Sequence, residues 1–412
     1  MKGHVHRRGK RWAYKYDAPP DPLTGERRVV TKSGFLTEKE AWAACREAIA
    51  KAEKGAFVAP SLRKLGPYLE DEWFPMVRNS LKASTFASYE DYARAYVIPV
   101  LGEVRLQALD AQRLNAFYDH LLKSGRVKAR TPAKPATPKM RGRASQARPT
   151  PKKPLNPGLA PKTVRNVHVM LHKALGDALA WRYVEHNAAE HAKPPRARRR
   201  KPTIWTVEQL AAFLTGQYQD RFYALYLLAA TTGMRRSEVC GLRWSSLDLE
   251  DGTVDLDETR VVVRGQATDS DGKSNDSVRR LALDPATVAA LVAHRKLQEE
   301  ERALFGSGWH TGNYVFRWED GRPVHPDTIR QRFNRAVAHL ALPRIRLHDM
   351  RHTYATAALR AGIAPKVISA RLGHASAAFT MDVYAHALPT MDRDAADAVA
   401  ALILGGRDAW RL

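Results

Sequence analysis

The sequence lacks the features that mark several classes of protein. Its two cysteines, Cys45 and Cys240, lie far apart and show no metal-ligand spacing, so we predict neither a disulfide framework nor a zinc site. No apolar run approaches the roughly 20 residues that cross a bilayer, and no charged, then apolar, then small-residue signal opens the chain. We therefore expect a soluble protein of the bacterial cytoplasm, with no membrane partner.

Acidic residues are also scarce. The 412-residue chain has 67 Lys and Arg against 43 Asp and Glu, a formal net charge of +24. This excess indicates a polyanionic partner such as nucleic acid. No acidic residue occurs between Asp119 and Asp177, and residues 124–160 are rich in Pro, Lys and Arg. Such a composition cannot bury enough apolar surface to fold, so we expect a flexible basic insertion that either adds phosphate contacts or is merely tolerated.

Residues 1–58 are predicted to form a small module of strands and one helix. Residues 11–16 alternate aromatic with basic or small side chains, as in a half-buried strand, and residues 27–31 form a second candidate strand. Thr37 is the expected N-cap of an alanine-rich helix. Cations on the strands are candidate DNA contacts, although a basic hairpin with a helix could serve another interaction. These candidates are Arg11, Lys15, Arg27 and Arg28.

Residues 62–192 show helical periodicity. Ser84 and Asp110 are expected to cap two helices with apolar stripes, and Pro161 occupies the first turn of a third. On this third helix Lys162 and Arg165 lie opposite the stripe, where they either contact phosphates or form a solvated surface.

A basic tract at residues 193–202 follows these helices. Its prolines and like charges predict an extended linker. Beyond it, Thr206 and Gln209 form a candidate capping box, and helices interrupted by one strand region at residues 254–283 are expected. Further candidate DNA contacts in the linker are Arg198, Arg199 and Arg200.

Two clusters of polar side chains suggest chemistry on a phosphate. Residues 232–238 begin with a glycine turn after an apolar helix and contain an arginine pair. His348 and Arg351 would share a helix face, where an imidazole and a guanidinium fork suit a phosphate oxygen. Near such cations Tyr384 is a candidate nucleophile. Taken singly, Tyr384 is better explained as a half-buried aromatic residue and His348 as a satisfied core histidine. The cluster at residues 232–238 overturns that interpretation.

A zinc-binding helix is the other interpretation of this segment. His348 and His352 are spaced as in such a helix, but Asp349 is not the expected glutamate and Arg351 shares the face. We therefore predict no metal.

The order Arg, Lys, His-x-x-Arg, His and Tyr resembles the signature of the tyrosine recombinase family, of the phage-integrase type. The resemblance covers the C-terminal half from about Thr203 to Leu412, and the N-terminal segments resemble the arm-type and core-binding domains of integrases more loosely. The fold implied is mainly α with small β-sheets. The implied parts are an arm-type module at 1–58, a core-binding domain at 62–192, a linker at 193–202, a catalytic domain at 203–388 and a tail helix within 389–412. The signature residues are Arg235, Lys273, His348, Arg351, His374 and Tyr384.

The resemblance also implies roles for the residues that match it. Arg235 and Arg351 would grip the scissile phosphate, with His348 and His374 as further donors. Glu238, one helical turn from Arg235, could orient that arginine.

Tyr384 would then attack to leave a 3′-phosphotyrosyl link, and Lys273 would protonate the leaving 5′ oxygen. Strand exchange through a Holliday junction implies a homotetramer on duplex attachment sites of a mobile element. The resemblance further implies a host DNA-bending protein and a directionality factor as candidate partners, and it implies no cofactor.

Two other functions and one structural alternative remain open from the residues. A non-catalytic DNA-binding regulator of the same fold is disfavoured by the complete set of six residues. A type IB topoisomerase-like enzyme has no need of the arm-like module. The tail helix either docks on its own domain or packs on a neighbouring protomer.

Overall fold

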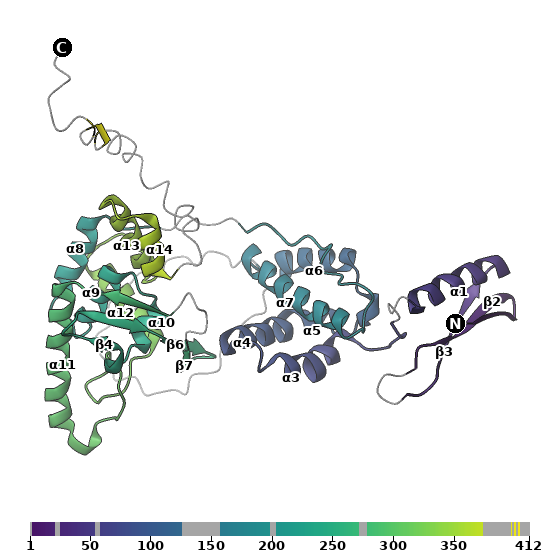
Figure 1. Ribbon diagram of the computed structural model, residues 1–412, viewed down its shortest axis with the longest axis horizontal. Helices are drawn as coiled ribbons and strands as arrows, with labels where there is room; N and C mark the ends of the chain where they lie inside the picture. The colour runs from purple at the N-terminus through teal and green to yellow at the C-terminus, as the bar shows by residue number, and fades with distance from the viewer. Residues whose placement is uncertain are drawn as a thin grey trace, which may run out of the picture. The chain divides into compact units, whose positions relative to one another are not determined.

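The computed structural model describes residues 2–20, 25–53, 58–125, 157–197, 203–271 and 278–373, together with Asp397, Val399, Ala400 and Ile403. The chain divides into two compact units, residues 1–199 and 200–412, within the basic tract at 193–202 (Figure 1). Within these ranges no helix combines the length and the apolar character that a bilayer crossing requires. The predicted fold class, mainly α with small β-sheets, is confirmed.

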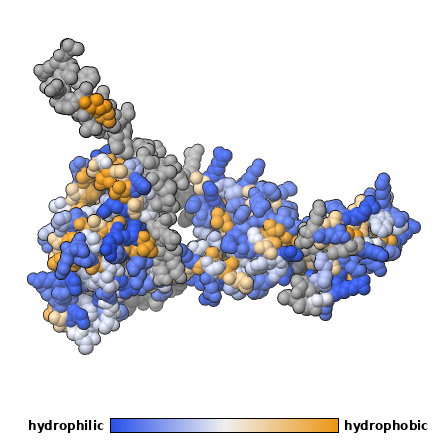
Figure 2. Space-filling model, in the orientation of Figure 1, coloured by the Kyte–Doolittle hydropathy of each residue, from blue (hydrophilic) through white to orange (hydrophobic). Residues whose placement is uncertain are grey.

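An antiparallel sheet and one helix form the N-terminal module. The strands are β1 (Gly3–Arg8), β2 (Arg11–Ala18) and β3 (Arg28–Phe35), in the order β1-β2-β3, and the helix is α1 (Glu38–Glu53). Tyr14 and Tyr16 of β2 are buried in a cluster with Cys45 of α1, whereas Lys15 between them is exposed. Thr37 caps α1 as predicted, because its Oγ1 accepts from the Glu40 N–H at 3.2 Å. Hydrophilic residues dominate the face of this module in Figure 2.

In the described ranges 58–125 and 157–197, helices build the next part of the first unit. They are α2 (Leu65–Pro67), the π-helical η1 (Tyr68–Trp73), α3 (Phe74–Val77), α4 (Ala83–Tyr92), the π-helical η2 (Ala93–Val97), α5 (Ile98–Leu101), the 3₁₀ turn η3 (Leu106–Ala108), α6 (Ala111–Ser124) and α7 (Pro161–Ala180). Each π-helical stretch ends two residues before a proline, Pro75 or Pro99. Proline has no N–H, so the regular helical ladder cannot continue unchanged through these positions.

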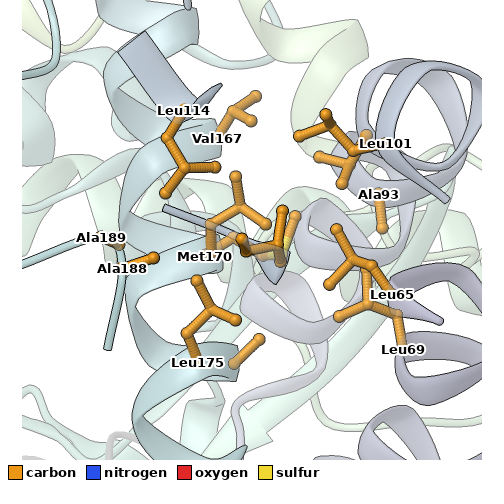
Figure 3. Packing of buried hydrophobic residues seen from close by; sticks show 14 of the residues in the cluster. Leu65, Leu69, Ala93, Leu101, Leu114, Val167, Met170, Leu175, Ala188 and Ala189 are labelled. Atoms are coloured by element: carbon orange, nitrogen blue, oxygen red, sulfur yellow. The ribbon is translucent and has the colours of Figure 1, made fainter. Parts of the chain in front are cut away.

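The centre of this helical part is apolar and is crossed by α7. Its Val167, Met170 and Leu175 pack with Leu65, Leu69, Leu101 and Leu114 from the other helices (Figure 3). Two polar contacts fix η1 on α7: Tyr68 donates to the Ala174 carbonyl at 2.7 Å, and Trp73 Nε1 donates to Asp177 at 2.8 Å.

The helix ends of this part test the predicted caps. Asp110 caps α6, because its carboxylate accepts from the Arg113 N–H at 2.7 Å, and Pro161 begins α7. The prediction for Ser84 is wrong, because α4 begins at Ala83 after Lys82 and has no side-chain cap. Serine is therefore accommodated in the first turn, where its N–H needs no helical partner. The predicted insertion at 124–160 lies mainly outside the described residues.

The second unit combines helices with small sheets. Its elements are α8 (Val207–Gly216), α9 (Tyr223–Thr232), α10 (Arg236–Gly241), η4 (Trp244–Ser246), β4 (Leu247–Asp248), β5 (Thr253–Leu256), β6 (Glu258–Val263), β7 (Gln266–Asp271), β8 (Arg279–Ala282), α11 (Pro285–Phe305), η5 (Gly306–Gly308), α12 (Pro326–His339), α13 (Asp349–Arg360) and α14 (Pro365–Leu372). Its core includes an aromatic group in which Phe213 contacts both Tyr226 and Phe333. The capping box of Thr206 and Gln209 is confirmed at the start of α8.

The predicted single strand region is wrong in detail. The strands begin at Leu247 and form two antiparallel sheets, β4-β5-β8 and β6-β7. The hairpin β6-β7 turns at Arg264 and Gly265, which both have positive φ. β5 pairs directly with β8. In the sequence, this hairpin therefore lies between two strands that are neighbours in the other sheet.

Candidate active site

Arg235 is the N-cap residue of α10 and lies two residues after a left-handed turn. Gly233 ends α9 with φ +69°, a conformation that glycine adopts at little cost. The turn directs Arg235 Nη1 to Glu238 at 2.6 Å and Nη2 to the Gly373 carbonyl at 2.8 Å. The side chain remains 34% exposed, so it is fixed but still accessible to a ligand.

Arg351 lies in the first turn of α13 and is only 3% exposed. Its Nη1 donates to the Gly233 carbonyl at 2.9 Å, and its Nη2 donates to the Leu372 carbonyl. One guanidinium therefore joins the end of α9 to the end of α14. Arginine suits this position because its planar fork can reach two fixed acceptors at once.

The end of α14 gathers three arginines on consecutive carbonyl groups. The Arg371 carbonyl accepts from Arg279 Nε at 2.6 Å, the Leu372 carbonyl accepts from Arg351, and the Gly373 carbonyl accepts from Arg235. The last carbonyls of a helix have no partner within it and carry partial negative charge. Gly373 has φ +63° and ends the helix. The next residue in the chain is His374.

Glu238 is the buried carboxylate of this cluster and is 2% exposed. It accepts from the Arg235 N–H at 2.7 Å and from Arg235 Nη1, and Arg279 donates to both of its oxygens at 3.2 and 3.0 Å. Burial alone would raise the pKa of Glu238, but Arg279 and then Arg235 lower it below its ordinary value. The carboxylate is therefore ionised at neutral pH and balances two cations.

His348 stands directly before α13, with its side chain exposed. Its ring makes an edge-to-face contact with His352, with centroids 5.5 Å apart. Partial desolvation, followed by the charges of His352 and Arg351, lowers the pKa of His348 to about 4. At neutral pH His348 is therefore an uncharged imidazole that can donate one hydrogen bond.

Arg346 and Asp349 fix the start of this helix. The Asp349 carboxylate accepts from the Arg346 N–H at 2.8 Å and from Arg346 Nη2 at 2.6 Å. Burial would raise the pKa of Asp349, but these hydrogen bonds lower it. His348 is exposed, whereas Arg351, three residues further along, is buried.

The structure thus brings together Arg235, Arg351 and Glu238, with His348 at the start of the Arg351 helix. Arg236, next to Arg235, instead pairs with Asp327 at 2.9 Å. The predicted Lys273, His374 and Tyr384 lie outside the described residues, as do the linker residues Arg198, Arg199 and Arg200.

The predicted DNA contacts in the first unit are exposed to different degrees. Arg11, Lys15, Lys162 and Arg165 are exposed, and Arg28 is half-buried. Arg27 is exposed but forms an ion pair with Asp17 at 2.7 Å.

Arg279 is the residue of the cluster that sequence reasoning missed. It follows the Lys273 segment beside a second arginine, Arg280, and composition does not distinguish the two. Strand alternation could have done so, because Arg279 shares a face with the buried Leu281 while Arg280 points to the opposite side. The side chain of Arg279 is 8% exposed and that of Arg280 is 68% exposed.

Comparison with known families decides what this cluster belongs to. Residues 206–391 match the model described as the phage integrase family. Residues 4–52 match an arm DNA-binding domain, and residues 68–122 match the N-terminal SAM-like domain of phage integrases. The chain belongs to the phage integrase family. The predicted recognition is confirmed, and with it the class of enzyme, a tyrosine recombinase that cleaves and rejoins DNA.

Individual integrases and recombinases resemble the chain over different lengths. The ICEBs1 integrase of Bacillus subtilis is 28% identical over 242 residues, which cover 58% of this chain and 66% of that protein. A tyrosine recombinase XerC-like protein of Caldanaerobacter subterraneus subsp. tengcongensis is 23% identical over 382 residues, which cover 88% of this chain and 89% of the relative.

Solved integrase structures show the same fold. The Tn1549 transposon integrase in complex with transposon right end DNA matches with a TM-score of 0.62 at 18% identity, over 82% of this chain and all of that chain (100%). The lambda integrase in a tetramer bound to a Holliday junction matches with a TM-score of 0.52 at 14% identity, over 93% of this chain and 94% of that one.

Proposed function

We propose that this integrase recombines the attachment sites of a mobile element through a covalent tyrosine link to DNA. The observation that carries the proposal is the convergence of Arg235 and Arg351 on the neighbouring carbonyls of Gly373 and Leu372, directly before His374. Two guanidinium groups held so close together form one cationic site. A phosphodiester matches both its charge and its fork geometry.

The arginines act on charge that develops during the reaction. As the phosphorus becomes pentacoordinate, its non-bridging oxygens gain negative charge, and donors that are already oriented stabilise it without rearrangement. His348, uncharged at neutral pH, donates one further hydrogen bond, and His374 adds another. Glu238 keeps Arg235 in place.

Tyr384 forms the new bond to phosphorus while the bond to the 5′ oxygen breaks. Lys273 gives a proton to that leaving oxygen, and the hydroxyl of Tyr384 gives its own proton to solvent water. The product is a 3′-phosphotyrosyl link and a free 5′ hydroxyl. Because the link keeps the phosphodiester energy, a 5′ hydroxyl from another strand can reverse the step, and neither a metal nor a nucleotide cofactor is required.

Two duplexes contain four strands to cut, and each chain supplies one Tyr384. The assembly we propose is therefore a homotetramer that passes through a Holliday junction, with a host DNA-bending protein and a directionality factor as partners. The net charge of +24 supports a location on the bacterial nucleoid in the cytoplasm. Exposed cations of the first unit, Arg11, Lys15, Lys162 and Arg165, contact phosphates, and so do Arg28 and the linker arginines 198–200.

A nicked suicide duplex tests the nucleophile. The duplex carries the shortest DNA segment, taken from beside the gene of this integrase, that the wild-type protein still cleaves. The reaction contains excess chelator. Wild type should form a covalent adduct, and Tyr384→Phe should not. The control Tyr218→Phe, which also removes a tyrosine hydroxyl but at a residue that is 64% exposed, should form the adduct as wild type does. An equal adduct with Tyr384→Phe would refute the assignment. No adduct from wild type on any bound flank would favour a non-catalytic DNA-binding protein.

A further inference from the structure

Resting on this proposed function, we propose that Arg279 is a positioning residue for Arg235 and acts through Glu238. Arg279 opens β8, at the downstream end of the segment that carries Lys273. Among the described residues, its side chain donates to Glu238 and to the Arg371 carbonyl, and both of these groups adjoin the contacts of Arg235.

The first contact fixes the carboxylate that holds Arg235. Arg279 donates to both oxygens of Glu238, and the same two oxygens accept from the side chain and the N–H of Arg235. A carboxylate with donors on both sides cannot rotate without losing a hydrogen bond. Both residues are almost fully buried, with 8% and 2% of their side chains exposed, so water cannot replace a lost donor.

The second contact fixes the other partner of Arg235. Arg279 Nε donates to the Arg371 carbonyl, two residues before the Gly373 carbonyl that accepts from Arg235 Nη2. A further bond holds the same strand and helix together, since Arg371 Nη2 donates to the Ala282 carbonyl at 3.1 Å. Arg279 therefore holds both groups that orient Arg235, although they belong to different helices.

Charge explains why one carboxylate serves two arginines. If Arg279 were neutral, the buried Glu238 would lose its strongest stabilising partner and its pKa would rise. The Glu238 carboxylate would then be less firmly held, and so would Arg235. The N–H groups of Arg235 that do not bind Glu238 would no longer have a fixed direction toward the phosphate. A displacement of about 1 Å in a catalytic group costs on the order of 10²-fold in rate.

Arg279→Gln and Arg280→Gln form a matched pair of variants. The two residues are neighbours on β8, but Arg280 is exposed and pairs with Asp255 at 2.6 Å. Both variants are tested on the suicide duplex that wild type cleaves, under single-turnover conditions with saturating protein. Arg279→Gln should form the covalent adduct on the order of 10²-fold more slowly than wild type. Arg280→Gln should stay within about twofold of wild type. A wild-type rate for Arg279→Gln would overturn the proposal while leaving the proposed function intact, because wild type cleaves the same duplex.

Two readouts separate positioning from general structural support. In a Glu238→Gln background, Arg279→Gln should slow the reaction by much less than it does alone, because only its contact with the Arg371 carbonyl is still lost, whereas independent effects would multiply. On a duplex with a 5′-bridging sulfur, the leaving thiolate needs no proton because thiols are far more acidic than hydroxyls. The Arg279→Gln defect should persist there, since it concerns the arginine clamp. Multiplying effects, or full recovery on the sulfur substrate, would overturn the proposal.

Folding is controlled by a second substitution. Thermal unfolding of both glutamine variants is measured alongside the rates. If Arg279→Gln does not fold, Arg279→Lys replaces it in every comparison, because lysine keeps the charge but cannot span Glu238 and the Arg371 carbonyl together. A folded Arg279→Lys that cleaves at the wild-type rate would equally overturn the proposal.

Discussion

A Cβ atom on Gly233 would lie 2.5 Å from Cδ2 of Leu372. Both residues also offer their carbonyl groups to Arg351. The end of α9 and the end of α14 are therefore in direct contact on either side of one guanidinium. The glycine has a steric role in addition to its left-handed turn, because a methyl group there would overlap the side chain of Leu372 and the ring of Tyr354, whose Cδ1 would lie 2.6 Å from it.

Gly233→Ala should therefore destabilise the catalytic unit by more than about 2 kcal/mol, from backbone strain together with overpacking. Gly362→Ala is the matched control. Gly362 also has positive φ, +76°, but no atom lies within 4 Å of its added Cβ, so only the strain of about 1 kcal/mol remains. Urea unfolding measures both losses, and equal losses would contradict the steric role.

The buried Glu238 predicts a loss of stability in acid. Its pKa is lowered in the folded protein, so its contribution is present above the unfolded value of about 4.3 and is lost as the pH falls through the folded pKa. Between pH 5.5 and 3.5 the free energy of unfolding should fall less steeply for Glu238→Gln than for wild type. Glu250→Gln, at an exposed glutamate, should follow wild type. Parallel curves for Glu238→Gln and wild type would exclude this contribution.

His348 should remain uncharged throughout the neutral range. Histidine-selective NMR of the DNA-free protein, with the signal assigned by its absence in His348→Gln, should give a midpoint near pH 4, where the pKa of His348 is about 4. As the pH falls below about 6.5, His348 becomes protonated in the unfolded chain before it does in the folded protein. The free energy of unfolding therefore decreases as the pH falls further, until the folded pKa is reached. A midpoint at or above 6.5 would mean that His348 approaches DNA as a cation.

The open face of the N-terminal sheet should contribute to the salt dependence of binding. Lys15 is exposed on β2, on the face turned away from α1. If it neutralises one phosphate, Lys15→Gln should reduce the slope of log K against log salt by about 0.9. Lys39→Gln, at an exposed lysine on α1, should leave the slope unchanged. A reduced slope for Lys39→Gln together with an unchanged slope for Lys15→Gln would place DNA on the helix side of the module.

Periodicity and caps anticipated much of the architecture, because they are local. The apolar stripe of α7 and the caps at Thr37, Asp110 and Thr206 all follow from residues within one or two turns. Strand β1 was not anticipated, since its sequence GHVHRR has little apolar alternation and gains its place by pairing with β2.

The site shows the same limit of local reasoning. Arg235 and Arg351 were found because their spacing matches a known signature, and Glu238 because it lies one turn from Arg235. Arg279 has no such local mark. Its role depends on a carboxylate 41 residues earlier and a carbonyl 92 residues later, which only the folded chain brings together.

The three carbonyls at the end of α14 have a consequence for DNA affinity. An arginine side chain that becomes fixed loses about 2 kcal/mol of rotamer entropy. Arg235 and Arg351 are already held by Gly373 and Leu372 before any phosphate is present. Their ordering is thus part of the folding free energy of the catalytic unit, and the free energy of binding DNA need not include it.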